Sequence, residues 1–133
     1  MKKRLLWLVY SAIALVLGAL MYGLFRQNTY IGKIVGMVIG SGFTVDDWFS
    51  GLCAWYLPDY LWVFSLSCAL FSIMLPKGKK IILWSGIAFS MGALWELLQM
   101  LEVVSGTADL CDIFLYGLAA LTAAIIAKQK KER

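Results

Sequence analysis

The sequence contains no histidine and only three cysteines, and 15% of its 133 residues are charged. Without histidine, the chain cannot perform Ser-His-Asp catalysis, and it cannot bind zinc or haem through a histidine ligand. Cys53, Cys68 and Cys111 fall short of the even and denser set that builds a disulfide framework. We expect them to be small buried hydrophobic residues. A bridge between Cys53 and Cys111 is the alternative.

The scarcity of charge argues against a water-soluble fold. Hydrophobic residues make up 62% of the chain, whereas a soluble domain has roughly 45–50% apolar and about 25% charged residues. A small domain exposes much of its surface and could not hide this excess from water. The composition therefore predicts a membrane protein. The net charge of +4 gives no indication of nucleic-acid binding, because lysines that flank a membrane span contact anionic lipids.

Four stretches are long enough to cross a membrane. At 1.5 Å per residue, a helix needs about 20 residues to cross a hydrocarbon core of about 30 Å. The first apolar run exceeds the roughly 7–15 residues of a signal-peptide core, so we interpret it as a retained helix. The sequence predicts one all-α, polytopic domain over residues 1–133. Its transmembrane helices are expected at about residues 5–25, 57–75, 81–101 and 110–127.

The basic residues predict the orientation. Ten of the twelve Lys and Arg residues fall in three clusters that four alternating helices place on one side, which is the positive-inside pattern. Seven of the eight acids then lie toward the opposite side. We therefore expect a bacterial cytoplasmic membrane with both termini in the cytoplasm. The basic clusters are Lys2, Lys3 and Arg4; Lys77, Lys79 and Lys80; and Lys128, Lys130, Lys131 and Arg133.

The segment 27–56 is irregular and is expected on the outer side. Gly32, Gly36 and Gly40 recur every fourth residue, and such a stripe on one helical face suits close helix packing. We expect this face to contact a second copy of the chain or another membrane protein. The apolar stretch 34–43 is about half a span, which favours a short re-entrant or interfacial helix over a fifth crossing.

Glu96 is the main candidate functional residue. An ionisable side chain inside a transmembrane helix costs about 2.5–3.5 kcal/mol on insertion scales. Glu96 lies about 22 Å from the cytoplasmic end of its helix and roughly 8 Å below the outer end, too deep for a helix cap. Gln99 follows three residues later on the same face. The structural alternative is a carboxylate that reaches the outer interface or pairs with Arg26 or Lys33.

Three aspartates have structural explanations of their own. Asp109 is suited to cap the last helix, in competition with Thr107, and Asp112 would close its first turn. Pro58 followed by Asp59 is typical of a first helical turn with proline at its favoured position.

These polar residues nevertheless share one depth near the outer boundary. Tyr116 lies one turn below Asp112, and tryptophans surround the region. Together they predict a polar pocket that opens to the outside and binds a lipid headgroup, a divalent cation or a proton. The residues expected at the pocket are Asp59, Glu96, Gln99, Asp109 and Asp112.

The second half of the chain resembles VanZ-like membrane proteins. Glu96-Leu97-Leu98-Gln99 is similar to the Glu-Leu-Leu-Gln that ends one helix in that family, and Asp112 follows a similar Gly- and Thr-containing loop. The sequence Leu57-Pro58-Asp59-Tyr60 looks like the start of the family's preceding helix. The resemblance implies an envelope protein linked to glycopeptide (teicoplanin) resistance, with Glu96, Gln99 and Asp112 at the matched positions.

We therefore expect a non-enzymatic protein that needs no cofactor and binds a lipid headgroup or an envelope precursor. A small oligomeric transporter or channel, with Glu96 as an ion or proton site, is the alternative. A membrane enzyme that holds a divalent ion against a pyrophosphate ranks third. Only Arg26 or Lys33 could then receive the phosphate, and metal binding is left open.

Overall fold

The computed structural model describes residues 2–25, 30–40, 48–104 and 108–132. Within these ranges every regular element is a helix, which confirms the predicted all-α fold. All the helices except the second are long and apolar enough to cross a membrane, so the chain has the build of a polytopic membrane protein. The helices are α1 (Lys2–Phe25), α2 (Tyr30–Ile39), α3 (Trp48–Met74), α4 (Lys79–Met100) and α5 (Leu110–Glu132).

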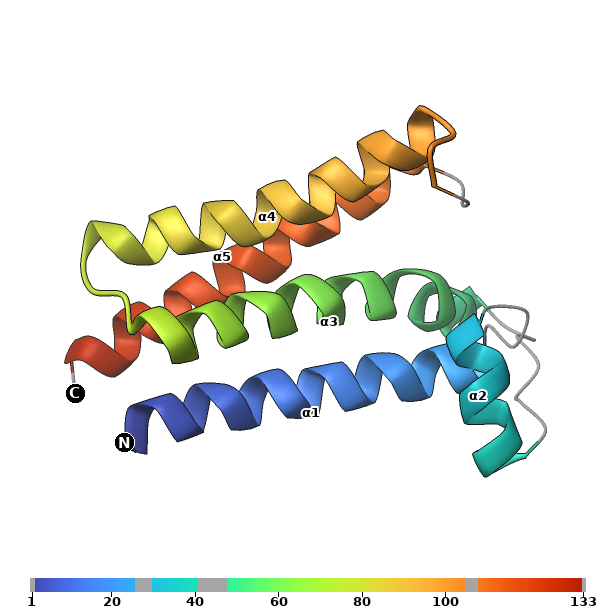
Figure 1. Cartoon of the computed structure of the whole chain (residues 1–133), viewed down its shortest axis with the longest axis horizontal. Coiled ribbons are helices and arrows are strands. Elements are labelled where there is room, and N and C mark those ends of the chain that lie inside the picture. The colour runs from blue at the N-terminus through green and yellow to red at the C-terminus, as the bar shows by residue number, and fades with distance from the viewer. Residues whose placement is uncertain (1, 26–29, 41–47, 105–107, 133) are drawn as a thin grey trace.

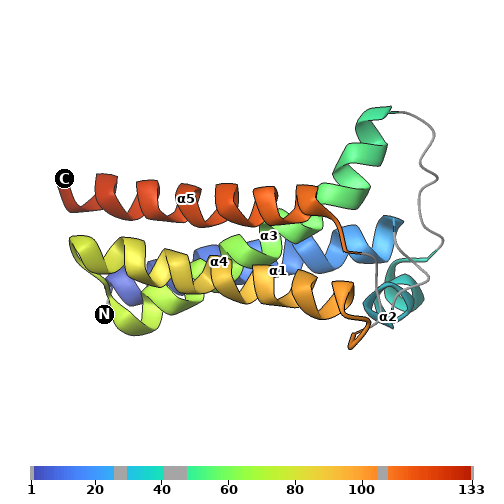
Figure 2. The ribbon, with the colours of Figure 1, turned by 90° about the horizontal axis from the view of Figure 1, so that it is seen from above.

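The four long helices form an antiparallel bundle with α3 at its centre (Figure 1). Helix α3 packs against α1, α4 and α5, and α4 and α5 also pack against each other. Both termini lie at the same end of the bundle (Figures 1 and 2). The short helix α2 packs against α1 at the opposite end, where the sequence predicted a short helix between the first two spans.

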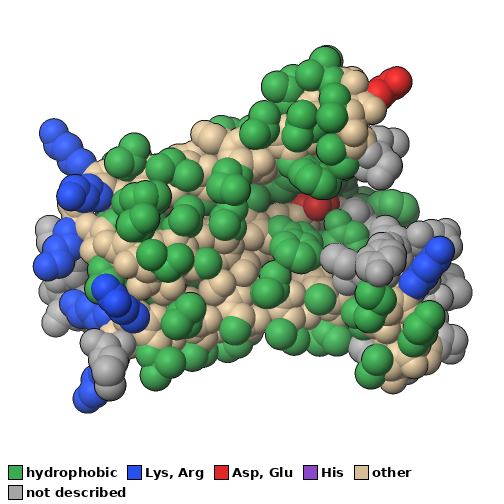
Figure 3. Space-filling model, in the orientation of Figure 1, with side chains coloured by type: hydrophobic (Ala, Val, Ile, Leu, Met, Phe, Trp, Pro, Cys, Tyr) green, Lys and Arg blue, Asp and Glu red, His purple; other side chains and the backbone are tan. Residues whose placement is uncertain are grey.

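Apolar side chains cover the outer surface of the long helices (Figure 3). Leu5, Val16, Ile82, Leu94 and Leu121 each expose more than half of their surface. Exposing that area to water would cost about 25 cal/mol per Å², whereas hydrocarbon imposes no such cost. The outward-facing residues therefore match a lipid environment.

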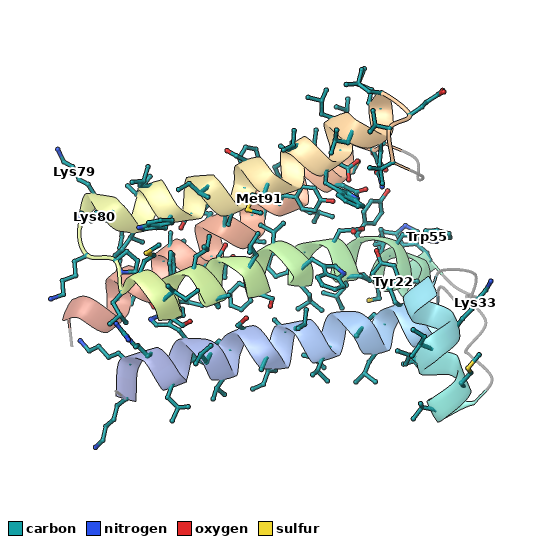
Figure 4. The ribbon with its side chains drawn as sticks, viewed as in Figure 1. Tyr22, Lys33, Trp55, Lys79, Lys80 and Met91 are labelled. Carbon is teal, nitrogen blue, oxygen red and sulfur yellow. The ribbon has the colours of Figure 1, made fainter. Side chains whose placement is uncertain are left out.

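Charged side chains of opposite sign occupy the two ends of the bundle (Figure 3). The lysine-rich end is formed by the starts of α1 and α4 and the end of α5. The acidic end is formed by the starts of α3 and α5 and the end of α4, and Lys33 of α2 also lies there (Figure 4). The described cations of the lysine-rich end are Lys2, Lys3, Arg4, Lys77, Lys79, Lys80 and Lys128. Arg26, Asp46 and Asp47 lie outside the described residues.

The second spanning helix begins earlier than the sequence predicted. Helix α3 starts at Trp48 rather than near residue 57, and Pro58 lies in its interior. Proline has no N–H to donate to the carbonyl one turn back, so it bends a helix. Figure 2 shows the first turns of α3 turned away from its remaining length. The predicted first turn at Pro58 was therefore wrong, and a helix N-terminus does not explain Asp59.

Two glycines shape the segment around α2. Gly23 of α1 touches α2 so closely that a Cβ atom there would overlap the side chain of Val35. Gly40 instead follows the last residue of α2 with a φ of 97°, and its N–H bonds the Gly36 carbonyl at 2.9 Å. Gly40 therefore ends the helix in the left-handed conformation that glycine favours.

Small residues let the long helices approach one another. On α5, Ala119, Ala120, Ala123 and Ala124 are buried. The first two pack in a cluster with Val63, Ala88 and Tyr116. The second two pack in a cluster with Trp7, Cys68, Phe71 and Ile81. Small residues favour close packing in membranes, where no hydrophobic effect drives helices together.

The cysteines only partly match the expectation. Cys68 is buried as predicted, whereas Cys53 is half-buried and Cys111 is exposed. No disulfide joins Cys53 to Cys111.

A pair of serines links α1 to α3. The Ser65 hydroxyl donates to the Ser11 carbonyl at 2.9 Å, and the two hydroxyl oxygens lie 3.1 Å apart. Because the single Ser65 proton is used on the carbonyl, the Ser11 hydroxyl supplies the proton of the second bond. Ser67, two residues along α3, instead bonds the Val63 carbonyl of its own helix at 2.8 Å.

We predict that Ser65→Ala lowers the free energy of unfolding more than Ser67→Ala. Hydrogen bonds between transmembrane helices contribute about 0.6 kcal/mol on average and up to about 1.7 kcal/mol. Both serines are buried, so Ser67→Ala controls for the loss of a hydroxyl within a helix. Reversible unfolding in mixed detergent micelles gives both values, and equal losses would contradict the assignment.

Candidate functional site

Helix α4 ends in a turn that sends the chain back toward its own last residues. The Val103 N–H bonds the Leu98 carbonyl at 2.9 Å, and the Glu102 N–H bonds the Gln99 carbonyl at 3.0 Å. This is the pattern of a Schellman motif, in which the residue after the helix adopts a left-handed conformation. Glu102 holds that position with a φ of 56°, although it is not glycine. The return brings Asp109 next to α4.

Asp109 caps the N-terminus of α5, as the sequence predicted. Its Oδ1 atom accepts the Cys111 N–H at 2.9 Å, and its carbonyl accepts the Asp112 N–H at 3.1 Å. A carboxylate in this position satisfies an N–H that the helix leaves unbonded and interacts favourably with the helix dipole. Thr107, the competing cap, lies outside the described residues.

Glu96 is buried, with 4% of its surface exposed, and both of its carboxylate oxygens accept hydrogen bonds. Oε1 accepts the Tyr116 hydroxyl at 2.8 Å, and Oε2 accepts the Asp109 N–H at 3.1 Å. The donors belong to α5 and its cap, so the carboxylate ties α4 to α5. Hydrogen bonds to ionised groups are about twice as strong as neutral ones.

The bonded partners differ from those considered in the sequence. Glu96 does not reach the boundary, because it is buried within the bundle. Lys33 is exposed on α2 and forms no ion pair with Glu96, and Arg26 lies outside the described residues. Among the described residues, the groups that stabilise the carboxylate are a phenol and a backbone amide.

Gly92 makes room for the Tyr116 ring. A Cβ atom on Gly92 would lie 2.8 Å from Cδ2 of Tyr116 and 3.0 Å from Cγ2 of Val63, closer than such atoms approach. Gly92 is one helical turn before Glu96 on the same face of α4. The ring thus lies on the bare backbone at Gly92, and its hydroxyl reaches Glu96.

The other predicted site residues surround this tie. Asp59 and Asp112 are half-buried, and both lie close enough to Tyr116 for their charges to act on its hydroxyl. Asp109 and Asp112 act in the same way on Tyr56 of α3. We call Asp59, Glu96, Asp109 and Asp112 the carboxylate cluster. An acidic side chain is visible in a recess at this end in Figure 3.

Gln99 is less closely connected to the cluster. It is half-buried one turn after Glu96, and its backbone carbonyl accepts the Glu102 N–H. Within the described part of the chain, its side-chain amide forms no hydrogen bond.

The cluster does not have the geometry of a metal centre. Among the described residues, no three Asp, Glu or Cys side chains converge closely enough to hold a metal ion. Aromatic residues lie beside the cluster at the acidic end: Trp48 and Trp55 are exposed on the first turns of α3, and Trp55 is labelled in Figure 4. Exposed tryptophan is typical of a membrane–water boundary.

Sequence reasoning missed the role of Gly92 and Tyr56. Gly92 precedes Glu96 by four residues, but Tyr116 lies on another helix, so the sequence alone gives no signal for their contact. Tyr56 was not among the predicted site residues, because its helix was expected to begin after it.

Comparison with protein-family models, curated proteins and solved structures gives no match. The resemblance to VanZ-like proteins therefore stays a prediction that rests on the residues quoted for it.

We predict that Gly92→Ala lowers the free energy of unfolding by about 1–3 kcal/mol, because overpacking would displace the Tyr116 ring. Gly86 is the matched control on the same helix. A Cβ atom there meets nothing within 4 Å, so Gly86→Ala is expected to be neutral or stabilising. Unfolding in mixed micelles measures both, and a harmless Gly92→Ala would show that the ring does not lie there.

We also predict that Tyr116→Phe lowers the free energy of unfolding by about 1–3 kcal/mol, because a buried carboxylate oxygen loses its donor. Tyr60→Phe is the control, since the half-buried Tyr60 ring is stacked on Phe64 with centroids 6.2 Å apart. The same unfolding measurement compares the two variants. If Tyr116→Phe were no more harmful than Tyr60→Phe, the bond to Glu96 would carry no energy.

Proposed function

We propose that the protein is a non-enzymatic, VanZ-like protein of the bacterial cytoplasmic membrane that binds a polar lipid headgroup or an envelope precursor at its carboxylate cluster. The observation that supports this most is the buried Glu96 carboxylate, bonded by Tyr116 and by the cap residue of α5, with half-buried Asp59 and Asp112 at the same end of the bundle. Acidic residues that only flank membrane-spanning helices would each be exposed to water at a separate helix end.

The charge of the cluster favours a particular ligand chemistry. The four carboxylate-cluster residues attract a cation and repel a bare phosphate. Carboxylate acceptors near the membrane boundary would select a ligand that presents an ammonium group. A tryptophan ring at the same end of the bundle can add a cation–π contact to that group. We therefore propose an amine-bearing headgroup or envelope precursor as the ligand class.

Within this proposal Glu96 positions the other groups. Its oxygens accept bonds from Tyr116 and Asp109, so it holds the start of α5 against α4. Asp59 and Asp112 are more accessible and supply negative charge at the mouth of the site. Ligand contact is therefore proposed for Asp59 and Asp112, and a positioning role for Glu96.

The membrane orientation follows from the same charges. Lysine and arginine are retained on the cytoplasmic side of membrane proteins, so we propose that the lysine-rich end and both termini are cytoplasmic. The carboxylate cluster then lies in the outer leaflet.

The test is lipid binding by purified protein in detergent, followed by native mass spectrometry. We predict that Asp59→Asn and Asp112→Asn together weaken binding of phosphatidylethanolamine by at least tenfold, because two charges that attract the ammonium group are removed. Glu102→Gln is the control for each single variant, Asp59→Asn or Asp112→Asn, since Glu102 is exposed at the same end and each of these changes removes one negative charge.

Two outcomes would overturn this proposal. One is unchanged phosphatidylethanolamine binding by the double variant at an unchanged protein level. The other is an equal loss in Glu102→Gln, which would indicate a general charge effect. In cells, the double variant should also change sensitivity to teicoplanin, and Glu102→Gln should not.

The transporter alternative receives less support. A carboxylate that carries ions must exchange its partners, whereas both Glu96 oxygens are engaged by protein donors. Ion or proton flux in proteoliposomes that is lost in Glu96→Gln and retained in Asp59→Asn would favour transport over binding.

A further inference from the structure

A cavity opens at the lysine-rich end, far from the carboxylate cluster. Its volume is about 600 Å³, and it lies between the start of α1, the end of α3, the α3–α4 connection and the end of α5. Ligand sites in proteins typically have about 300–1,000 Å³. The space is therefore large enough for part of a small amphiphilic molecule.

The floor of the cavity is apolar and rigid. Trp7, Phe71 and Ile81 line it and are buried. The Trp7 and Phe71 rings pack edge to face with centroids 5.2 Å apart. These residues belong to the core cluster that α1, α3, α4 and α5 share, so the floor is held by four helices. Such a surface offers nothing to a hydrated ion but suits a hydrocarbon chain.

The cavity also has a cationic side. Lys3 of α1 and Lys77 of the α3–α4 connection line it, and both are exposed. The connection is held in place by Leu75, whose N–H bonds the Phe71 carbonyl at 3.0 Å and whose φ of 43° turns the chain out of the helix. Leu6 and Leu75 also line the cavity.

We propose that this cavity binds one anionic glycerophospholipid of the adjacent leaflet, with the phosphate between Lys3 and Lys77 and an acyl chain against Trp7 and Phe71. Two cations above an apolar floor match the two halves of such a lipid, and basic pockets between transmembrane helices recognise anionic headgroups in this way. A free anion would use only the lysines, and a neutral lipid only the floor. The bound lipid would join α1 to the α3–α4 connection.

The inference does not depend on the proposed function of the acidic end. The two sites share no residue, and they select opposite charges. Loss of binding at one site is therefore expected to leave the other unchanged, which separates the two proposals experimentally.

Native mass spectrometry with phosphatidylglycerol as the probe tests the proposal. We predict that Lys3→Gln with Lys77→Gln weakens phosphatidylglycerol binding about 25-fold, since each lysine near a membrane surface contributes about fivefold. The control is Lys79→Gln with Lys80→Gln, which removes equal charge. Those side chains lie at the start of α4 (Figure 4) and do not line the cavity.

Ala127→Phe supplies an independent variant, because Ala127 lines the cavity and the new ring would fill it without a change of charge. We expect it to weaken phosphatidylglycerol binding at least fivefold, and this variant decides the question if the lysine variant does not fold. Equal affinity for phosphatidylglycerol and phosphatidylcholine, equal losses in both lysine pairs, or displacement of the lipid by 10-fold excess inorganic phosphate would each overturn the proposal.

Discussion

A charged carboxylate can remain inside a membrane protein only where the protein itself supplies its hydrogen-bond donors. In this chain those donors are the Tyr116 hydroxyl and the Asp109 N–H, and both bond Glu96. The requirement constrains several other parts of the molecule. Gly92 must lack a side chain so that the tyrosine ring fits, and the chain must turn back after Glu102 so that the Asp109 amide arrives at the carboxylate. The relative position of α4 and α5 therefore follows from one buried acid.

The two ends of the bundle are built in different ways although both carry charge. At the acidic end, polar groups enter the helix interface and bond one another, so the charge is partly buried and ordered. At the lysine-rich end, the core stays apolar through Trp7, Phe71 and Ile81, and the lysines remain on the surface. Lysine permits this arrangement because its long apolar stem lets the ammonium group reach water. The bundle thus presents a preorganised cluster on one side and flexible cations around an apolar cavity on the other.

The sequence was sufficient for features that depend on composition and failed where tertiary contacts decide. The four spans and the two charged ends follow from runs of apolar residues and from lysine positions. The cap at Asp109 follows from a local preference. The role of Pro58 was predicted wrongly because proline suits both a first helical turn and an interior bend. Only the helical structure of residues 48–57 distinguishes the two cases. The contact of Gly92 with Tyr116 joins residues on two helices, so no local pattern contains it. The buried alanine face of α5 was not predicted, because it depends on which helices become its neighbours.

The residues that resemble the VanZ-like pattern take on a physical meaning in this fold. The matched residues Glu96 to Gln99 lie at the end of α4, and the matched Asp112 lies in the first turn of α5. Between them, the Asp109 N–H donates to Glu96 while the Asp109 side chain caps α5. A short motif with this spacing is what a closed helical hairpin with a buried acid requires, whatever the hairpin binds. The motif by itself therefore argues for a shared hairpin rather than for a shared ligand. The proposed ligand contacts are instead the half-buried Asp59 and Asp112, and Asp59 comes from α3, outside the hairpin. The proposed binding site accordingly involves three helices, and the motif accounts for two of them.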